Sequence, residues 1–176
     1  MATLVLTAIG DDHAGLVRAL SSVIAQHGGN WETSRMAHLA GKFAGIVLVT
    51  VPDGNVDGLI TDLGPLDEQG LLTVSAELST PAVRDDGSTR LTLELVGVDR
   101  PGIVRDVSDV LARQKVNIEE LETETVSAPM DGGEIFKARM VMSLPDAISI
   151  DYLTEALEDL AGQLMVDIEL DEPDRR

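Results

Sequence analysis

The sequence of 176 residues has no cysteine, few aromatic residues and few basic ones. Without cysteine the chain forms neither a disulfide scaffold nor a Cys-ligated zinc or iron–sulfur site. The 13 basic residues face 31 acidic ones, which gives a formal net charge of −18, and only four aromatic side chains could stack on bases. Because such a charge repels phosphate, the composition argues against direct binding of nucleic acid.

Long apolar runs are absent as well. The first apolar run, residues 3–9, has the length of a strand and follows no basic residue, so it does not resemble a signal peptide. No segment approaches the roughly 18 consecutive apolar residues of a membrane helix. Apolar residues still make up 44% of the chain, which is enough for a core. We therefore expect a soluble, cytoplasmic protein of one ordinary domain or two small ones.

What the sequence does contain is an internal repeat. Shifted by 87 residues, the segment from Leu4 to Glu32 is identical to the segment from Leu91 to Glu119 at twelve of 29 positions, without a gap. Average composition gives about two identities by chance. Phe43 matches Phe136 at an offset of 93, so the second copy holds six extra residues, which lie within 125–133. The duplication predicts a first domain at 1–80, a linker at 81–89, a second domain at 90–172 and a tail at 173–176.

Each copy shows the same order of hydrophobic periodicities. Apolar residues three and four apart predict helices at 16–26 and 56–63 and, in the second copy, at 103–114 and 150–160. Strands are predicted at 3–9, 30–39, 43–51 and 71–78, and again at 90–98, 117–126, 135–144 and 164–170. The order βαββαβ and the handedness of βαβ crossovers predict an α+β fold of two ferredoxin-like domains in tandem, packed side by side. Since a one-sided sheet leaves one face uncovered, we also expect a homodimer.

The most specific local motif is the turn between the first strand and the first helix of each copy. It reads Asp11-Asp-His-Ala-Gly-Leu-Val17 in the first copy and Val98-Asp-Arg-Pro-Gly-Ile-Val104 in the second. Glycine permits a close backbone approach, and the helix start presents free N–H groups to an anion such as a carboxylate. The same spacing also suits a tight turn with no ligand, so both interpretations stay open.

A second repeated feature is an asparagine, Asn30 or Asn117, after the first helix of each copy. An asparagine at this place can end a helix in the left-handed conformation. Its amide can also offer a donor and an acceptor to the ammonium and carboxylate groups of an amino acid. Duplication copies structural residues as readily as functional ones.

These motifs together resemble the ACT domain, because Asp-Arg-Pro-Gly-Ile-Val opens a helix and Asn-Ile follows some thirteen residues on. The resemblance covers both copies, and the tandem arrangement without a catalytic domain is similar to the glycine cleavage system transcriptional repressor family. It implies a non-catalytic regulatory protein that binds a small amino acid of the glycine or serine class where two ACT domains meet. It also implies a protein partner, a transcription regulator of glycine cleavage. The family's ligand contacts correspond to Asp12, His13, Gly15, Leu16, Asn30 and Trp31 in the first copy and to Asp99, Pro101, Gly102, Ile103, Asn117 and Ile118 in the second.

The two copies differ at this motif. His13-Ala14 stands where the second copy has Arg100-Pro101, so the first turn is less rigid and its charge depends on pH. One of the two predicted ligand sites could therefore be altered or inactive. The difference also supports an alternative function, that of an interaction or scaffold module without a ligand. A detached regulatory subunit of an amino-acid metabolic enzyme is a further alternative.

The sequence predicts no catalytic residues, no metal site and no cofactor. The three histidines, His13, His27 and His38, do not have the spacing of metal ligands, and no nucleophile, Walker A or Rossmann motif is present. Three glutamates of the second copy, Glu120, Glu122 and Glu124, would share one face of a strand. Such a row could bind a divalent cation or could guard an edge strand against aggregation.

Overall fold

The computed structural model describes residues 1–79, 88–128 and 133–171, and the structural statements below refer to these residues. The chain divides into two compact units, Met1–Val83 and Arg84–Arg176. Most of the expected linker at 81–89, the tail at 173–176 and part of the insertion within 125–133 lie outside the described residues. Each unit is therefore described by itself.

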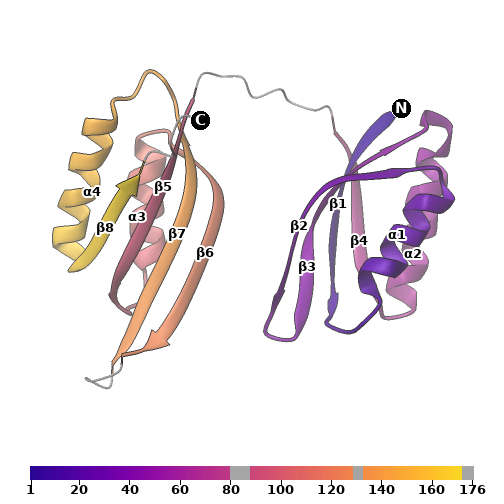
Figure 1. The fold of residues 1–176 in the computed structure, drawn as a ribbon, viewed down its shortest axis with the longest axis horizontal. Coiled ribbons are helices and arrows are strands. Elements are labelled where there is room, and N and C mark those ends of the chain that lie inside the picture. The colour runs from indigo at the N-terminus through magenta and orange to yellow at the C-terminus, as the bar shows by residue number, and fades with distance from the viewer. Residues whose placement is uncertain (80–87, 129–132, 172–176) are drawn as a thin grey trace. The chain divides into compact units, whose positions relative to one another are not determined.

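Both units have the predicted order βαββαβ, as Figure 1 shows. The first unit contains β1 (Ala2–Asp11), α1 (Leu16–Gln26), β2 (Asn30–Leu39), β3 (Lys42–Val51), the 3-10 turn η1 (Asp53–Asn55), α2 (Val56–Glu68) and β4 (Thr73–Leu78). The second contains β5 (Thr89–Val98), α3 (Ile103–Arg113), β6 (Asn117–Ser127), β7 (Glu134–Leu144), α4 (Ile150–Leu164) and β8 (Val166–Asp171). The strand orders are β2-β3-β1-β4 and β6-β7-β5-β8, with antiparallel neighbours throughout. The α+β fold of two ferredoxin-like units is thereby confirmed.

Alternation along the strands directs one side of each sheet toward its two helices. Leu4, Leu6 and Ala8 of β1 are buried, and the residues between them point to the opposite side. Helix α1 contributes Leu16, Leu20 and Ile24 to the same core. The second unit repeats the arrangement with its own core, which includes Leu91, Leu93, Leu95, Ile103, Val107 and Leu111. In each unit the helices lie on one side of the sheet (Figure 1), and we call the other side the open face.

Two helices extend beyond their predicted ends. Helix α2 continues past Pro65 to Glu68, because Leu66 is 5% exposed and extends the buried stripe of Leu59 and Leu63. The burial of that leucine outweighs the hydrogen bond that proline cannot donate. Helix α4 likewise runs to Leu164, which is buried, so β8 begins two residues later than predicted.

Candidate functional site

The first strand-to-helix turn has the same geometry in both units. Gly15 and Gly102 precede α1 and α3 with φ of 104° and 99°, a left-handed conformation that favours glycine. The turn is tied to the neighbouring hairpin in both cases, since Asp12 N–H donates to Gly41 O over 2.9 Å and Asp99 N–H donates to Glu134 O over 2.8 Å. The glycine at this position is therefore required by the backbone conformation, whether or not a ligand binds.

The start of each first helix carries no side-chain cap. Neither Gly15 nor Gly102 offers a side chain to the first-turn amides, and no capping hydrogen bond forms there. The intrahelical bonds begin with Ala19 N–H to Gly15 O and Asp106 N–H to Gly102 O, both 2.9 Å long. The amides before them point out of the helix end, where the dipole also favours a negative charge. The two helix starts have the chemistry that a carboxylate needs.

The surroundings of the two helix starts differ in charge. In the second unit Asp106 stands in the first turn of α3, where Arg105 Nη2 lies 2.7 Å and Arg100 Nη2 lies 3.5 Å from its carboxylate oxygens. Hydrogen bonding to Asp106 raises the pKa of Arg105. The first turn of α1 has no acidic residue, and Ala19 takes the place of Asp106. Within the first turn of the helix, a carboxylate is therefore present in the second unit only, where two arginines pair with it.

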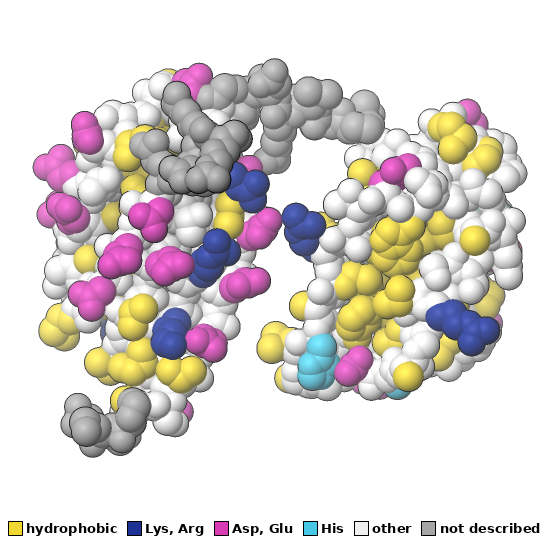
Figure 2. Space-filling model, in the orientation of Figure 1, with side chains coloured by type: hydrophobic (Ala, Val, Ile, Leu, Met, Phe, Trp, Pro, Cys, Tyr) yellow, Lys and Arg dark blue, Asp and Glu magenta, His cyan; other side chains and the backbone are white. Residues whose placement is uncertain are grey.

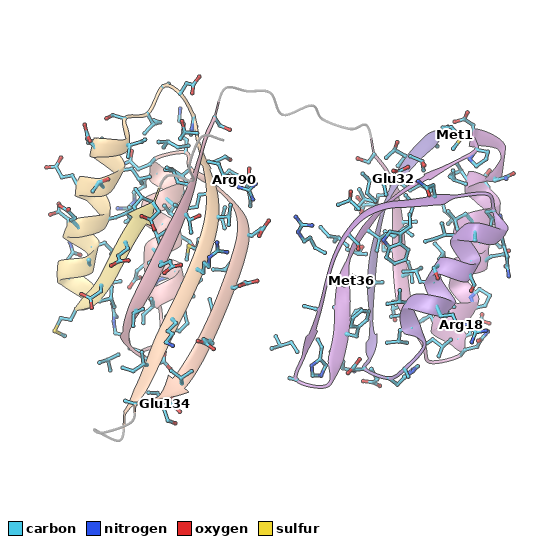
Figure 3. The ribbon with its side chains drawn as sticks, in the orientation of Figure 1. Met1, Arg18, Glu32, Met36, Arg90 and Glu134 are labelled. Carbon is cyan, nitrogen blue, oxygen red and sulfur yellow. The ribbon has the colours of Figure 1, made fainter. Side chains whose placement is uncertain are left out.

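The predicted asparagines lie at the other end of each sheet. Asn30 pairs with Thr50, which also pairs with Thr3 near the start of β1, whereas the turn begins after Asp11 at the end of β1. The strand between these ends has ten residues, so the two features are roughly 30 Å apart. Figure 3 shows Glu32 and Arg18, which mark the two ends in the first unit, well separated. A single unit does not bring its turn and its asparagine together.

The same separation holds in the second unit. Asn117 pairs with Ser143, the partner of Arg90, while the Asp99 amide bonds to Glu134. Arg90 and Glu134 lie at opposite ends of the second sheet in Figure 3. The predicted site residues thus form two separate groups in each unit, and a shared site remains a prediction.

A bulge sets the direction of the side chains at the start of each second strand. The register of β2 shifts between Trp31 and Thr33, and that of β6 between Ile118 and Glu120. Trp31 and Ile118 face the helices and pack against the core of their own unit. Asn30 and Asn117 are exposed at the open face. The tryptophan and isoleucine therefore serve the core, and what they can still offer a ligand is backbone of an edge strand.

Asn30 has a partner within its own strand. Its Nδ2 donates to Glu32 Oε1 over 2.9 Å, and Thr50 Oγ1 donates to the same oxygen over 2.8 Å. These bonds, that of Asn30 first, lower the pKa of Glu32. In the second unit the acidic side chains after the bulge point to a different partner, since Arg90 lies 4.0 Å from Glu119. The two asparagines are thus equivalent in backbone position but not in environment.

The histidines are dispersed over the first unit. His27 Nε2 lies 2.9 Å from Asp62 Oδ2, and His38 Nε2 lies 3.6 Å from Asp12 Oδ2. His13 lies in the exposed turn before α1. Within the described part of the chain, no group of three or more His, Cys, Asp or Glu side chains is placed to hold a metal ion.

The open face of the second sheet carries a concentration of charge that the sequence indicated only in part. Glu120, Glu122 and Glu124 do share a face, as predicted, and they lie on the open side of β6. Their neighbours across the sheet are Arg90, Glu94, Lys137, Arg139, Asp167, Glu169 and Asp171. Lys137 lies 3.4 Å from Glu124 and Arg139 lies 3.7 Å from Glu94, around a hollow of about 380 Å³. Figure 2 shows acidic side chains, with fewer basic ones, gathered over the strands of this unit.

Fold, turn and repeat together define a class of protein: two βαββαβ units whose first helix starts at an uncapped, glycine-led turn. Profiles of the ACT domain match residues 2–77 and, separately, residues 86–166. The chain therefore belongs to the ACT-domain family and contains two ACT domains in tandem. It is 36% identical over 81 residues to a UPF0237 protein of Methanopyrus kandleri, an alignment that covers 46% of this chain and 83% of the relative.

Two solved structures are similar to the chain over nearly its whole length. An unknown protein from Galdieria sulphuraria is 31% identical, with a TM-score of 0.81 and coverage of 98% of both chains. A protein assigned as a glycine cleavage system transcriptional repressor is 20% identical, with a TM-score of 0.70 and coverage of 97% of this chain and 96% of the other. The second similarity shows a shared fold. Among the described residues, no helix is long and apolar enough to cross a membrane.

Proposed function

We propose that the chain is a non-catalytic, cytoplasmic regulatory protein that binds a small amino acid of the glycine or serine class where two ACT domains meet. The observation that carries this proposal is the uncapped helix start after a glycine-led turn, which occurs at the same place in both units. A free amino acid has a carboxylate for those amides and an ammonium group for a side-chain oxygen. Membership of both units in the ACT-domain family supports the same conclusion.

The separation of turn and asparagine within a unit determines how such a site would be assembled. Because they lie at opposite ends of one sheet, a ligand that contacts both needs the turn of one domain and the asparagine of another. Two domains meet that requirement when their edge strands β2 and β6, or two copies of one of them, run antiparallel to each other. The asparagine then orients the ligand that the turn of the other domain holds. The domains can belong to one chain or to two chains of a homodimer.

The charge around the helix starts makes the two turns unequal as carboxylate sites. Asp106 places a negative charge in the first turn of α3, whereas Ala19 leaves the start of α1 without one. A charge near a helix start changes binding by about 0.3–1 kcal/mol, which is about two- to fivefold in affinity. Because Arg100 and Arg105 pair with Asp106 and partly offset its charge, we expect the two turns to differ by no more than this factor as carboxylate sites.

Signalling would then proceed through protein contacts, with a transcription regulator of glycine cleavage as the partner. A solved relative assigned as a repressor of that system supports this choice. The net charge of −18 opposes direct contact with DNA. For regulation, the amino acid needs to favour one state over another by only about 1–3 kcal/mol.

Isothermal titration calorimetry of the full chain with glycine, serine, alanine and leucine tests the proposal. We expect saturable heat with at least one of the small amino acids, and weaker or no heat with leucine. Asn30→Ala and Asn117→Ala should each weaken binding at the site that its asparagine completes. Gly54→Ala is a surface control, because a Cβ added at this residue of η1 would have no heavy atom within 4 Å.

A second pair of variants tests which turn holds the carboxylate. Asp106→Asn removes the resident charge and keeps the shape, so it should strengthen binding about two- to fivefold if the second turn is a site. Ala19→Asp should weaken binding by a similar factor if the first turn is a site, with Ala19→Asn as the uncharged control. Absence of heat with every amino acid, and identical behaviour of all these variants, would refute the sensor and favour the scaffold alternative.

A further inference from the structure

The edge strands β2 and β6 carry opposite charges at equivalent positions. In the described part of the chain, each is the outermost strand of its sheet, with a neighbouring strand on one side only. The copies match at an offset of 87, which makes Arg35 on the open face of β2 the counterpart of Glu122 on the open face of β6. Both side chains are exposed. The centre of one edge is therefore positive and the centre of the other is negative.

The other acidic side chains of these two edges already have partners within their own units. Glu32, at the bulge of β2, accepts two hydrogen bonds. On β6, basic side chains of β5 and β7 lie within 4.0 Å of Glu119, Glu120 and Glu124. The ion pairs among the described residues do not include Glu122. Its charge is therefore available to a partner from outside the unit.

We propose that β2 of one chain pairs antiparallel with β6 of a second copy of this chain, in the register that places Arg35 opposite Glu122. Residues directly opposite each other share a face of the sheet, and their side chains contact. On the helix side of the joined sheets, the next position brings Leu121, which is 44% exposed, opposite Met36, which packs against the core of the first unit. The pairing thus combines an ion pair on one face with an apolar contact on the other.

Pairing of two identical edges satisfies the charges less well. Two copies of β6 in the equivalent register would bring Glu122 opposite Glu122 and Glu120 opposite Glu124, which places three carboxylates of each copy side by side. Two copies of β2 would bring Arg35 opposite Arg35. Like charges directly opposite each other destabilise a pair of strands, whereas opposite charges stabilise it. Charge complementarity therefore selects the pairing of β2 with β6.

The same register brings each asparagine to a turn. Asn117 of one chain comes beside the β2–β3 hairpin of the other chain, to which the turn before α1 is bonded. Asn30 comes beside the β6–β7 hairpin, to which the turn before α3 is bonded. Each turn thus meets an asparagine equivalent to the one that its own unit holds roughly 30 Å away. The second copy supplies that asparagine, so each site is incomplete without it.

The short connection between the units requires a second copy for this pairing. Leu78 ends β4 and Thr89 begins β5, eleven residues further on, so the two are at most about 36–40 Å apart. In one continuous sheet they would be six strand spacings apart, about 29 Å, and eight residues apart along the strands, about 27 Å. The straight line between them, about 40 Å long, would run through the intervening strands. The connection is too short for the detour over a face of the sheet.

The inference rests on the proposed function only in giving the asparagines a ligand, so its test uses none. Sedimentation equilibrium of the full chain in a buffer free of amino acids should give twice the chain mass of 18.7 kDa. Arg35→Glu and Glu122→Arg should each raise the dissociation constant about tenfold or more, because each places like charges opposite each other at two points of the dimer. The double variant restores opposite charges and should recover most of the loss.

Two charge reversals elsewhere in the chain are the matched controls. Arg18→Glu on α1 and Glu77→Arg on β4, the opposite edge of the first sheet, change the net charge by the same amounts, and both side chains are exposed. Both should leave the dissociation constant unchanged within about twofold, because neither residue lies on the paired edges. Circular dichroism of the same samples checks that every variant is folded.

A disulfide tests the register directly, because the chain has no cysteine of its own. Thr33 should lie opposite Glu124 of the second copy, at a Cα distance of about 4.5–5.5 Å that a disulfide can span. A mixture of Thr33→Cys and Glu124→Cys proteins should therefore form covalent dimers on oxidation, far more than either protein alone. Thr33→Cys mixed with Glu122→Cys, which is two positions out of register, should form few. A chain that carries both Thr33→Cys and Glu124→Cys should also form covalent dimers.

Three results would overturn the proposal. They are a parent protein that stays monomeric up to high concentration, a double charge variant that associates no better than the single ones, and a disulfide that closes within one chain. Calorimetry separates the two proposals, because a dimer of this register that binds no amino acid would refute the sensor and leave the strand pairing intact. Binding by a monomer would do the reverse.

Discussion

Gly97→Ala in β5 and Gly162→Ala in α4 should change the stability of the second unit in opposite directions. Gly97 lies in the central strand β5, and a Cβ there would be 2.3 Å from Val166 Cγ1 and 3.1 Å from Val166 Cα. Gly162 lies inside α4, and a Cβ there would have no heavy atom within 4 Å. Gly97→Ala therefore forces β8 away from β5, while Gly162→Ala only adds a methyl group to an open helix surface.

The structure sets the magnitudes. Val166 is 8% exposed, and the contact involves its backbone, so Gly97→Ala should destabilise the second unit by about 1–3 kcal/mol. Gly162→Ala should stabilise it by about 0.5–1 kcal/mol, because alanine loses less conformational freedom than glycine in a helix. The two variants should differ by about 1.5–4 kcal/mol. In a unit of this size, that corresponds to roughly 6–32 °C in melting temperature.

Urea unfolding followed by two probes measures the effect. Trp31 is the one tryptophan of the chain and packs against the core of the first unit, so its fluorescence follows that unit. Far-UV circular dichroism follows both units. The dichroism transition should separate the two variants, and Gly10→Ala should instead shift the fluorescence transition, since a Cβ at position 10 would lie 2.1 Å from Leu71 O. Equal midpoints for Gly97→Ala and Gly162→Ala would refute the packing argument.

Two further predictions concern the carboxylates near the two ends of the first sheet. Asn30→Ala should raise the pKa of Glu32 toward its ordinary value, because the largest cause of the lowered pKa is the hydrogen bond from Asn30. An NMR titration of the Glu32 carboxyl carbon measures this pKa. An unchanged pKa would contradict the hydrogen bond between Asn30 and Glu32. Lys42→Gln should likewise raise the pKa of Asp11, whose carboxylate bonds to the Lys42 ammonium group. Folding lowers both pKa values, so each carboxylate stabilises the folded state above its unfolded pKa near pH 4. This stabilisation is lost as the pH falls through the folded pKa. The urea midpoint should therefore fall less between pH 7 and pH 3 in each variant than in the parent protein.

The fold could be predicted from the sequence because the repeat shows every feature twice. Leu4 and Leu6 recur as Leu91 and Leu93, and both pairs are fully buried in the structure. What the pattern did not show is where helix α2 ends, since Gly64 and Pro65 normally break a helix. Only the position of Leu66 against the core decides that boundary, and that position depends on tertiary packing.

The candidate site was predicted residue by residue but not in its arrangement. The turn around Gly15 and Gly102 is a local feature, so its conformation follows from a few neighbouring residues. The distance from that turn to Asn30 depends on the register of β1, β2 and β3, which no local pattern contains. The bulge after Trp31 is likewise not visible in a local pattern. It shifts the register by one residue, and this shift decides which of two neighbouring side chains faces the core.

The two copies have kept their inner faces alike and changed their outer ones. Thr7, Arg35 and Ile46 of the first open face correspond to Glu94, Glu122 and Arg139 of the second, although the core positions beside them remain aliphatic in both. A core restricts substitution through packing, whereas an open face is restricted only by what it contacts. If both open faces met only water, both would be expected to become polar. The first has kept Ile46, which is 50% exposed, at the position where the second has Arg139, so the two open faces have been under different restrictions since the duplication.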